Sequence, residues 1–149
     1  MYHGREANQE AKVADTISKI EYYSVGIPNK CGTGAQLMTA FKEAGVNFVA
    51  TWGYPAGKGK AQVDLVPSDA AAFKKAARKL KIEVGPKQAA LYVLGEDRVG
   101  AIAELLGKLA GAGVNVRALQ ALCGCPGCFG ALIQVEQADA RKAAKALGI

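Results

Sequence analysis

The sequence predicts an α+β protein made of two similar units in tandem, each with an antiparallel sheet that carries helices on one face. Two observations support this prediction. The segments 29–50 and 97–118, set 68 residues apart, match without gaps at 8 of 22 positions. Each unit also alternates short apolar runs, typical of strands, with segments whose apolar residues have helical spacing. Repetition of this kind indicates two copies of one structural unit.

The first unit is predicted over residues 17–84. Strands are expected at Ile20–Ile27, Val46–Tyr54 and Ala61–Val66, with a short closing strand at Lys81–Val84. Two apolar stripes with spacing i, i+3, i+4, i+7 indicate the helices. The stripes consist of Gly34, Leu37, Met38 and Phe41, and of Phe73, Ala76, Ala77 and Leu80. Gly45 is expected to end the first helix, and Ser68-Asp69 to cap the second.

The second unit is predicted over residues 88–149. Its strands are expected at Ala89–Leu94, Val114–Leu122 and Ala131–Val135. Its helix stripes are Ile102, Leu105, Leu106 and Leu109, and Ala140, Ala143, Ala144 and Leu147. Gly113 is expected to end the first of these helices and Asp139 to cap the second. The fourth strand is missing, so we expect it to be supplied by the other unit or by another chain. The order of elements is the ferredoxin-like pattern, βαββαβ.

Composition and charge favour a globular protein of the cytoplasm. Half of the residues are apolar, and no apolar run approaches the roughly 20 residues of a membrane span. The polar N-terminus lacks the apolar core of a signal peptide, and we expect residues 1–16 to form a flexible tail. Much of the net charge of +6 lies on the second helix of the first unit. Such a pattern is typical of a solvated helix face, so we expect neither a nucleic-acid partner nor a membrane.

The loop before the first helix of each unit carries a family resemblance. In the second unit it reads Asp97-Arg-Val-Gly100, and Ala112-Gly-Val-Asn115 follows the helix. This segment resembles the ACT domain, a small amino-acid-sensing regulatory module with an Asp-Arg-Pro-Gly-like loop. The first unit has a weaker version, Asn29-Lys-Cys-Gly32 and Ala44-Gly-Val-Asn47. The resemblance covers nearly the whole chain from about Ile17 and implies tandem ACT-type domains. Cys31 and Val99 replace the proline of the family's loop.

The resemblance implies that a small ligand, usually an amino acid, binds where this loop meets a neighbouring domain. Free backbone N–H groups at the start of a helix favour a carboxylate, and glycines let the backbone approach it closely. The candidate ligand-binding residues are Asn29, Lys30, Cys31, Gly32, Thr33, Gly34 and Asn47 in the first unit, and Asp97, Arg98, Val99, Gly100 and Asn115 in the second. The alternative for Gly32 and Gly100 is a turn requirement alone. The alternative for the two asparagines is a local cap after the helix-ending glycine.

Three of the four cysteines, Cys123, Cys125 and Cys128, lie within six residues in the predicted turn between the last two strands. Thiolates at this spacing supply three of the four ligands of a zinc site, and Cys31 would be the fourth if its loop reached this turn. A thioredoxin-type redox pair is disfavoured because the motif does not begin a helix. The alternative is a turn made by Pro126-Gly127 with the cysteines as small fillers. We expect no cofactor, with zinc or another thiophilic metal as the competing hypothesis.

The sequence shows no catalytic constellation. Its single histidine, His3, lies in the N-terminal tail, and no Ser/His/Asp set, carboxylate pair or phosphate-binding loop is present. We therefore expect a regulatory protein and not an enzyme, one that binds a small molecule and acts through domain pairing and oligomerisation. The expected partners are a second copy in a homodimer and a regulated enzyme. The competing hypothesis is a thiol-based metal-binding or redox-sensing module built on the clustered cysteines.

Overall fold

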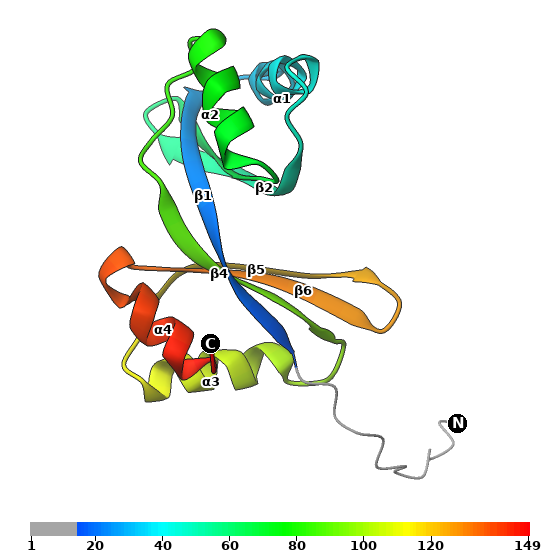
Figure 1. Cartoon of the computed structure of the whole chain (residues 1–149), viewed down its shortest axis with the longest axis vertical. Helices are drawn as coiled ribbons and strands as arrows, with labels where there is room; N and C mark the ends of the chain where they lie inside the picture. The colour runs from blue at the N-terminus through cyan, green and yellow to red at the C-terminus, as the bar shows by residue number, and fades with distance from the viewer. Residues whose placement is uncertain (1–14) are drawn as a thin grey trace.

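The computed structural model describes residues 15–149 and confirms the predicted α+β class (Figure 1). Of the predicted flexible tail, all but Asp15 and Thr16 lies outside the described residues, and Thr16 already begins a strand. The strands are β1 (Thr16–Pro28), β2 (Phe48–Gly57), β3 (Lys60–Pro67), β4 (Gln88–Glu96), β5 (Val116–Cys125) and β6 (Cys128–Val135). The helices are α1 (Thr33–Glu43), α2 (Ala70–Lys79), α3 (Ala101–Gly111) and α4 (Ala140–Ala146), the last after a 3₁₀ turn at Gln137–Asp139. None of the helices within residues 15–149 has the length and apolar content that crossing a membrane requires.

The six strands within residues 15–149 form one antiparallel sheet, in the order β2-β3-β1-β4-β6-β5. The sequence predicted a separate sheet for each unit, so the continuous sheet is a difference. Its cause is the length of β1, which at 13 residues is the longest strand described. The helices lie at the two ends of the molecule, α1 and α2 beyond one part of the sheet and α3 and α4 beyond the other (Figure 1).

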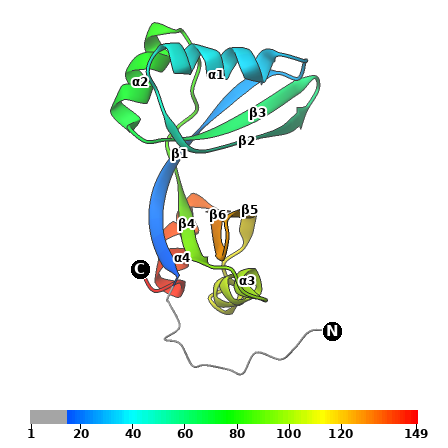
Figure 2. The same ribbon diagram turned by 90° about the vertical axis from the view of Figure 1, so that its right-hand side faces the viewer.

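Strand β1 joins the two parts because it pairs twice. Its segment Thr16–Tyr22 pairs with β4, and Tyr23–Pro28 pairs with β3. We call the C-terminal part of β1 with α1, β2, β3 and α2 the first half, and the N-terminal part of β1 with β4, α3, β5, β6 and α4 the second half. The N-terminal part of β1 therefore occupies the place in the second half where the missing fourth strand was expected. Figure 2 shows β1 and β4 running together between the halves.

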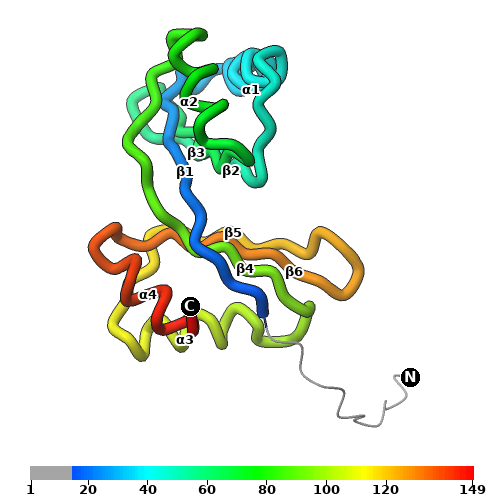
Figure 3. The backbone as a smooth tube through the Cα atoms, in the orientation of Figure 1, coloured from blue at the N-terminus to red at the C-terminus, as the bar shows by residue number. Residues whose placement is uncertain are grey.

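The strand predicted at Lys81–Val84 does not form, and this prediction was wrong. Lys81 has a φ of 54°, so the backbone turns directly after α2. One backbone bond, from Gly85 N–H to the Ser24 carbonyl (2.9 Å), ties the segment to β1, and Pro86 has no N–H to add another. The segment still runs beside β1 on its way to β4 (Figure 3).

Each half has its own core between its two helices and one face of the sheet. The first-half core is aromatic: Tyr23, Phe41 and Phe73 are at most 2% exposed, and ring centroids lie 5.1–5.2 Å apart in the Tyr23–Phe73 and Phe41–Phe73 pairs. The second-half core is mainly aliphatic, with Leu109 and Ile133 fully buried. Because the cores differ in kind, the repeat preserves backbone positions and not side-chain packing.

Helices α1 and α3 end in the same way, as the sequence predicts. Gly45 and Gly113 have φ values of 74° and 67°, the left-handed conformation that glycine adopts at low cost. The residue after each glycine donates its N–H to a carbonyl five residues back: Val46 to Phe41 (3.0 Å) and Val114 to Leu109 (2.9 Å). This is a Schellman motif, which satisfies carbonyl groups at the helix end.

The two predicted N-caps have different outcomes. Asp69 caps α2, since its carboxylate accepts hydrogen bonds from the N–H groups of Ala71 (2.9 Å) and Ala72 (3.0 Å). Asp139 makes no cap hydrogen bond to α4, and that prediction was wrong. The 3₁₀ turn places Asp139 in a helical conformation, and its carboxylate instead pairs with Lys142 Nζ at 3.1 Å.

The helix-free faces of the two halves meet around Tyr22. Val66 from β3, Ala90 from β4 and Leu132 from β6 are buried with it, and Trp52 from β2 packs against this cluster. Both tyrosines of the Tyr22-Tyr23 pair are buried, because alternate residues of β1 face opposite sides of the sheet. The open face of the sheet is therefore a third, smaller core that both halves share.

Asp64 is the charged residue at this shared face, and it is only 1% exposed. Its carboxylate accepts hydrogen bonds from Ser24 Oγ (2.6 Å), Gln62 Nε2 (2.9 Å) and Tyr54 Oη (3.2 Å). A fourth, from Gln134 Nε2 (3.3 Å), comes from the second half. Burial, and after it the Asp64 charge, raises the pKa of Tyr54. These bonds make Asp64 the polar link between the halves.

Candidate functional site

The structure places the two predicted ligand loops far from each other. The first-half loop (29–32) follows β1, and the second-half loop (97–100) follows β4. Because β1 and β4 are antiparallel, the loops leave this strand pair at opposite ends (Figure 2). One chain therefore presents two separate loops, each next to the first helix of its own half.

The two loop glycines share one backbone conformation. Gly32 and Gly100 are the N-cap residues of α1 and α3, with φ values of 90° and 85°. The turn requirement considered for these glycines is therefore real, since other residues adopt such a φ at a cost. A Cβ built on either glycine would have no atom within 4 Å, so the space beside the backbone is open. A ligand role for them stays a prediction.

The start of α3 has N–H groups that no side chain caps. Helix α2 differs, because Asp69 there accepts from the backbone of the first turn. Uncapped N–H groups and the positive end of the helix dipole attract an anion. In the second half, Ile102 and Ala103 at this helix start also line a cavity.

This second-half cavity has a volume of about 240 Å³. It lies between the 97–103 segment, β5 and the start of β6. Its polar lining comes from Asp97, Arg98 and Cys123, and its apolar lining includes Leu122 and Phe129. It is smaller than the roughly 300–1,000 Å³ typical of pockets for drug-sized ligands. The dimensions and the mixed lining suit a small polar metabolite.

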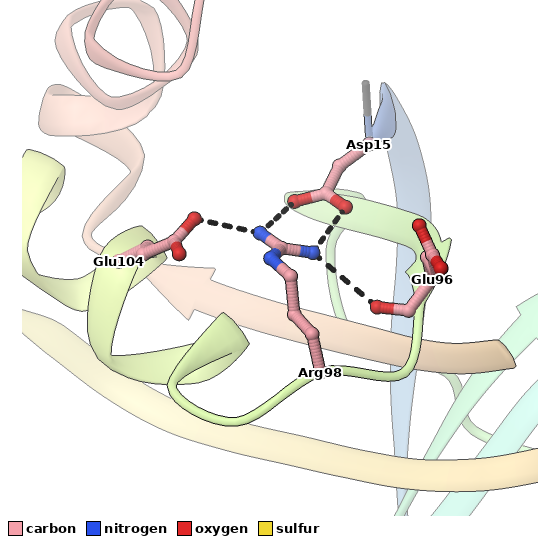
Figure 4. A network of polar contacts seen from close by, with 4 residues as sticks. All are labelled: Asp15, Glu96, Arg98 and Glu104. Carbon is pink, nitrogen blue, oxygen red and sulfur yellow. Dashed lines mark hydrogen bonds and ion pairs between the residues drawn. The ribbon is translucent and has the colours of Figure 1, made fainter. Parts of the chain in front are cut away.

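Arg98 is held by its own chain (Figure 4). Its guanidinium donates two parallel hydrogen bonds to Asp15 (2.9 and 3.0 Å), one to Glu104 (2.7 Å) and one to the Glu96 carbonyl (3.3 Å). The hydrogen bonds to Asp15 and then Glu104 raise the pKa of Arg98 above its ordinary value. Its Nε is buried and has no partner within residues 15–149. Arg98 therefore fixes the loop to the start of β1 and keeps one donor unused.

Gly95 makes room for this ion pair. A Cβ at position 95 would overlap the Asp15 carboxylate and the Phe129 ring. The Arg98 guanidinium lies 6.0 Å from the centre of the same ring. Gly95 thus allows Asp15, Arg98 and Phe129 to assemble beside the cavity. The first half has Ile27 at the equivalent position.

The first-half loop is stabilised by a hydroxyl group, whereas the second-half loop is held by the Arg98 ion pairs. The Thr33 hydroxyl donates to the carbonyls of Pro28 (2.6 Å) and Lys30 (2.9 Å), so its polar group is used within the loop. Asn29, Lys30, Cys31 and Gly32 are exposed, and Gly34 is half-buried. In the second half Val99 is fully exposed, and Asp97 is exposed as well. The structure brings Asp97, Arg98 and Gly100 to one cavity, and we find no comparable role for Val99.

Asn47 and Asn115 follow the helix-ending glycines, as predicted, and both are exposed. The Asn47 carbonyl accepts hydrogen bonds from Ser68 N–H and Ser68 Oγ, both at 3.0 Å. These bonds involve only the backbone of Asn47. A role of the Asn47 and Asn115 side chains, in ligand binding or as a local cap, stays a prediction.

The clustered cysteines occupy the β5–β6 turn. Cys125 and Cys128 form a disulfide with Cα atoms 5.4 Å apart, while Cys123 and Cys31 are free thiols. A hydrogen bond to the Asp97 carboxylate, and after it burial, raises the pKa of Cys123. Within residues 15–149, no three His, Cys, Asp or Glu side chains are grouped so as to hold a metal ion. The metal site at Cys123, Cys125 and Cys128 stays a prediction, and it would require the disulfide to be reduced.

A larger hollow of about 610 Å³ lies along the free edge of β1, between Gly26, Lys60 and Glu83. It has more volume than the second-half cavity but lacks a helix N-terminus. We therefore take the cavity at Asp97 as the candidate site.

The fold can be compared with those of known structures. The chain has an α+β fold with an antiparallel sheet and paired helices, which resembles that of ACT-type regulatory domains. It is similar to protein BT0572 from Bacteroides thetaiotaomicron (TM-score 0.75, 18% identity, covering 88% of each chain). It is also similar to the ligand-free regulatory subunit of aspartate kinase from Thermus thermophilus (TM-score 0.63, 18% identity, covering 93% of this chain and 97% of that one).

A third similar structure is the aspartate kinase of Clostridium acetobutylicum, described as an allosteric enzyme (TM-score 0.60, 18% identity). The match covers 96% of this chain but 35% of that enzyme. No family profile and no curated protein sequence matches the chain. At these identities the likeness shows the fold alone.

Sequence reasoning missed several residues of the site. Asp15 was assigned to the tail, although it binds Arg98 from 83 positions away. Phe129 and Glu104 were also missed. A signal for Glu104 was present, because an acidic residue in the first turn of a helix is favourable and lies near a loop arginine. The sequence carried no comparable signal for Asp15.

Proposed function

We propose that this chain is a non-catalytic regulatory protein built from two ACT-type domains in tandem, the first and second halves. Its ligand is an amino acid or a similar zwitterionic metabolite, and the binding site is the second-half cavity. The observation that carries this proposal is the meeting of the Asp97 carboxylate with the uncapped start of α3 at one cavity of about 240 Å³. The fold resemblance to a regulatory subunit of aspartate kinase supports it.

The cavity offers complementary groups for each end of an amino acid. The ligand carboxylate would accept hydrogen bonds from the N–H groups of Ile102 and Ala103, helped by the helix dipole and the unused Arg98 Nε. The ligand ammonium would lie against Asp97. An aliphatic or aromatic side chain would contact Leu122 and Phe129. Arg98 acts mainly as a positioning residue, because Asp15 and Glu104 hold its terminal nitrogens.

The regulatory output is proposed to pass through oligomerisation and a partner enzyme in the cytoplasm. Because the two ligand loops of one chain leave the β1–β4 pair at opposite ends, they cannot complete a site with each other. A second copy in a homodimer would provide a neighbour for each loop. Ligand binding would then bias how the chains are arranged, provided that the ligand binds one arrangement more tightly than the other.

A thermal-shift panel of amino acids and metal ions, with and without a chelator, tests this function. A ligand at about 100 times its Kd should add about 2.7 kcal/mol of stability, which corresponds to roughly 5–10 °C in melting temperature. Light scattering after gel filtration, with and without the stabilising amino acid, measures the oligomeric state.

Matched variants locate the site. Asp97→Asn keeps the size of the side chain and removes its charge, so the stabilisation by the amino acid should largely disappear. Asp139→Asn removes a carboxylate of the second half that lies outside the cavity, so it should leave the stabilisation intact. If no amino acid raises the melting temperature and a chelator lowers it, the metal hypothesis replaces this one.

A further inference from the structure

The turn between β5 and β6 is attached directly to the candidate site. Pro126 and Gly127 form the turn inside the Cys125–Cys128 disulfide. The Gly127 carbonyl accepts a hydrogen bond from the N–H of Asp97 at 3.0 Å. Cys128 is also the strand partner of Glu96, the residue before Asp97. The disulfide therefore encloses the very carbonyl that holds the first residue of the loop.

The same segment also lines the cavity. Cys123 and Asp97 both contribute to the lining. Cys123 is a free thiol, whereas Cys125 is the exposed sulfur of the disulfide, which an attacking thiolate can reach. The two sulfurs of the disulfide and the free thiol have separate roles.

The first half provides an internal comparison. There the Asn29 N–H donates to the Gly59 carbonyl at 2.9 Å, the same bond 68 residues earlier. The corresponding turn, at Gly57–Lys60, has no cysteine. The contact between turn and loop is therefore part of the repeated backbone and forms without a disulfide. The Cys125–Cys128 bond is an addition to one half, in the turn that bonds to Asp97 of the candidate site.

We propose that Cys125 and Cys128 are a reversible redox-modification site for small-molecule thiol–disulfide couples of the glutathione type, and that its oxidation state controls the position of Asp97. In oxidation, one cysteine thiolate attacks the small disulfide, releases one thiol and forms a mixed disulfide. The other cysteine then attacks the protein sulfur of this mixed disulfide, forms the Cys125–Cys128 bond and releases the second small thiol, so the S–S bond of the small disulfide is the one that is broken. Two S–H bonds are lost, one S–S bond forms, and the two electrons and two protons end on the two released thiols.

Reduction reverses this exchange and removes the covalent closure of the turn. The Gly127 carbonyl then has more freedom, and its bond to Asp97 opens more often. Opening displaces the carboxylate that lines the cavity. The consequence for ligand binding rests on the proposed function, whereas the thiol chemistry and the response of Asp97 do not.

The thiol chemistry is tested by alkylation and intact-mass measurement of the full chain. After equilibration with oxidised glutathione, at most two cysteines, Cys31 and Cys123, should be alkylated, because either of them is protected where it forms a mixed disulfide with glutathione. After treatment with dithiothreitol, all four cysteines should be alkylated. When the reduced protein is returned to oxidised glutathione, Cys125 and Cys128 should again be protected from alkylation. Four reactive thiols in the oxidised sample would overturn the proposal.

The structural response is tested by amide hydrogen exchange, measured by NMR, without any ligand. Reduction should speed exchange of the Asp97 amide by about fivefold or more, since one net hydrogen bond is weakened. The Asn29 amide, which makes the equivalent bond in the first half, should not change. Unchanged exchange at Asp97 in a sample that has gained two thiols would overturn the proposal.

Two variants complete the test. Cys125→Ser combined with Cys128→Ser should show the fast Asp97 exchange of the reduced protein and no response to dithiothreitol. Cys31→Ser should keep the full redox response. If the double serine variant instead shows slow exchange at Asp97, the disulfide does not control the loop. Because these readouts need no bound metabolite, failure of the amino-acid hypothesis would leave them unaffected.

Discussion

The two halves of the molecule use the same backbone contacts around the loops predicted to bind a ligand but different side chains to stabilise them. In both, a left-handed glycine begins the first helix, and the amide of residue 29 or 97 bonds to the turn of the last hairpin. The first half then closes its loop with the Thr33 hydroxyl. The second half uses the ion pairs of Arg98 and a disulfide in the adjoining turn. The comparison teaches that the repeat preserves a scaffold for a loop, while the chemistry at the loop is free to differ.

On the shared face, too, equivalent positions of the two halves carry different residues, and here the differences make the halves fit each other. Asp64 and Leu132 occupy equivalent positions, 68 residues apart, as do Val66 and Gln134. Each half therefore contributes one polar and one apolar residue, in opposite order. Gln134 of the second half donates to Asp64 of the first, while Val66 and Leu132 belong to one buried cluster. The halves became complementary to each other, so neither is a copy that the other could replace.

The largest expected effect comes from truncating equivalent core residues, Phe41 in the first half and Leu109 in the second, both 0% exposed. Phe41→Ala should lower the free energy of unfolding by about 3–5 kcal/mol and Leu109→Ala by about 2–5 kcal/mol, because each leaves a cavity. Since β1 pairs in both halves, each variant should unfold in a single transition.

Urea unfolding followed by two probes checks this prediction. Far-ultraviolet circular dichroism reports the whole chain, whereas fluorescence of Trp52, the only tryptophan, reports β2 of the first half and the shared face on which it packs. In Leu109→Ala both midpoints should fall together. A fluorescence midpoint that stays at the wild-type value would show that the halves unfold independently, and the shared β1 would then not couple them.

The next effect concerns the polar link between the halves. Asp64→Leu, which copies the equivalent residue of the second half, should cost about 2–3 kcal/mol, because the half-buried Ser24 and the buried Gln134 lose their acceptor. Combining it with Gln134→Val removes one of these donors. The double variant should therefore be less destabilised than the sum of the two single variants. Additive losses in urea unfolding would show that the Gln134–Asp64 bond contributes nothing to the link.

Local patterns in the sequence predicted the elements well, because they depend on neighbouring residues. The helix stripes, the helix-ending glycines Gly45 and Gly113, and the uncapped loops before α1 and α3 all follow from spacing within about ten positions. What the sequence could not supply was long-range pairing. Nothing local indicates that β1 pairs with both β3 and β4, or that Asp15 lies against Arg98. The predicted strand at Lys81–Val84 failed for a related reason, since its apolar residues pack on the core without a ladder partner.

In the candidate site, too, local features could be predicted from the sequence and long-range contacts could not. The loop residues Asp97, Arg98 and Gly100 were found because the resemblance and the helix start single them out. The link from the loop to the hairpin was missed, since it depends on the Gly127 carbonyl and on which sulfurs pair. For the cysteine cluster the sequence left both a turn and a metal site open, because spacing alone does not distinguish a thiol from a half-cystine, and the metal site stays a prediction.

The smallest expected effect separates the two predicted N-caps. Asp69→Ala should lower the free energy of unfolding by about 1 kcal/mol, because the N–H groups of Ala71 and Ala72 lose their acceptor. Asp139→Ala should change it by less than about 0.5 kcal/mol, because that side chain makes a partly exposed ion pair with Lys142 and no cap bond. Urea midpoints of the two variants, measured side by side, distinguish these cases. Equal losses would mean that Asp139 does cap α4, and that the 3₁₀ turn before this helix gives way to the capped arrangement which the sequence predicts.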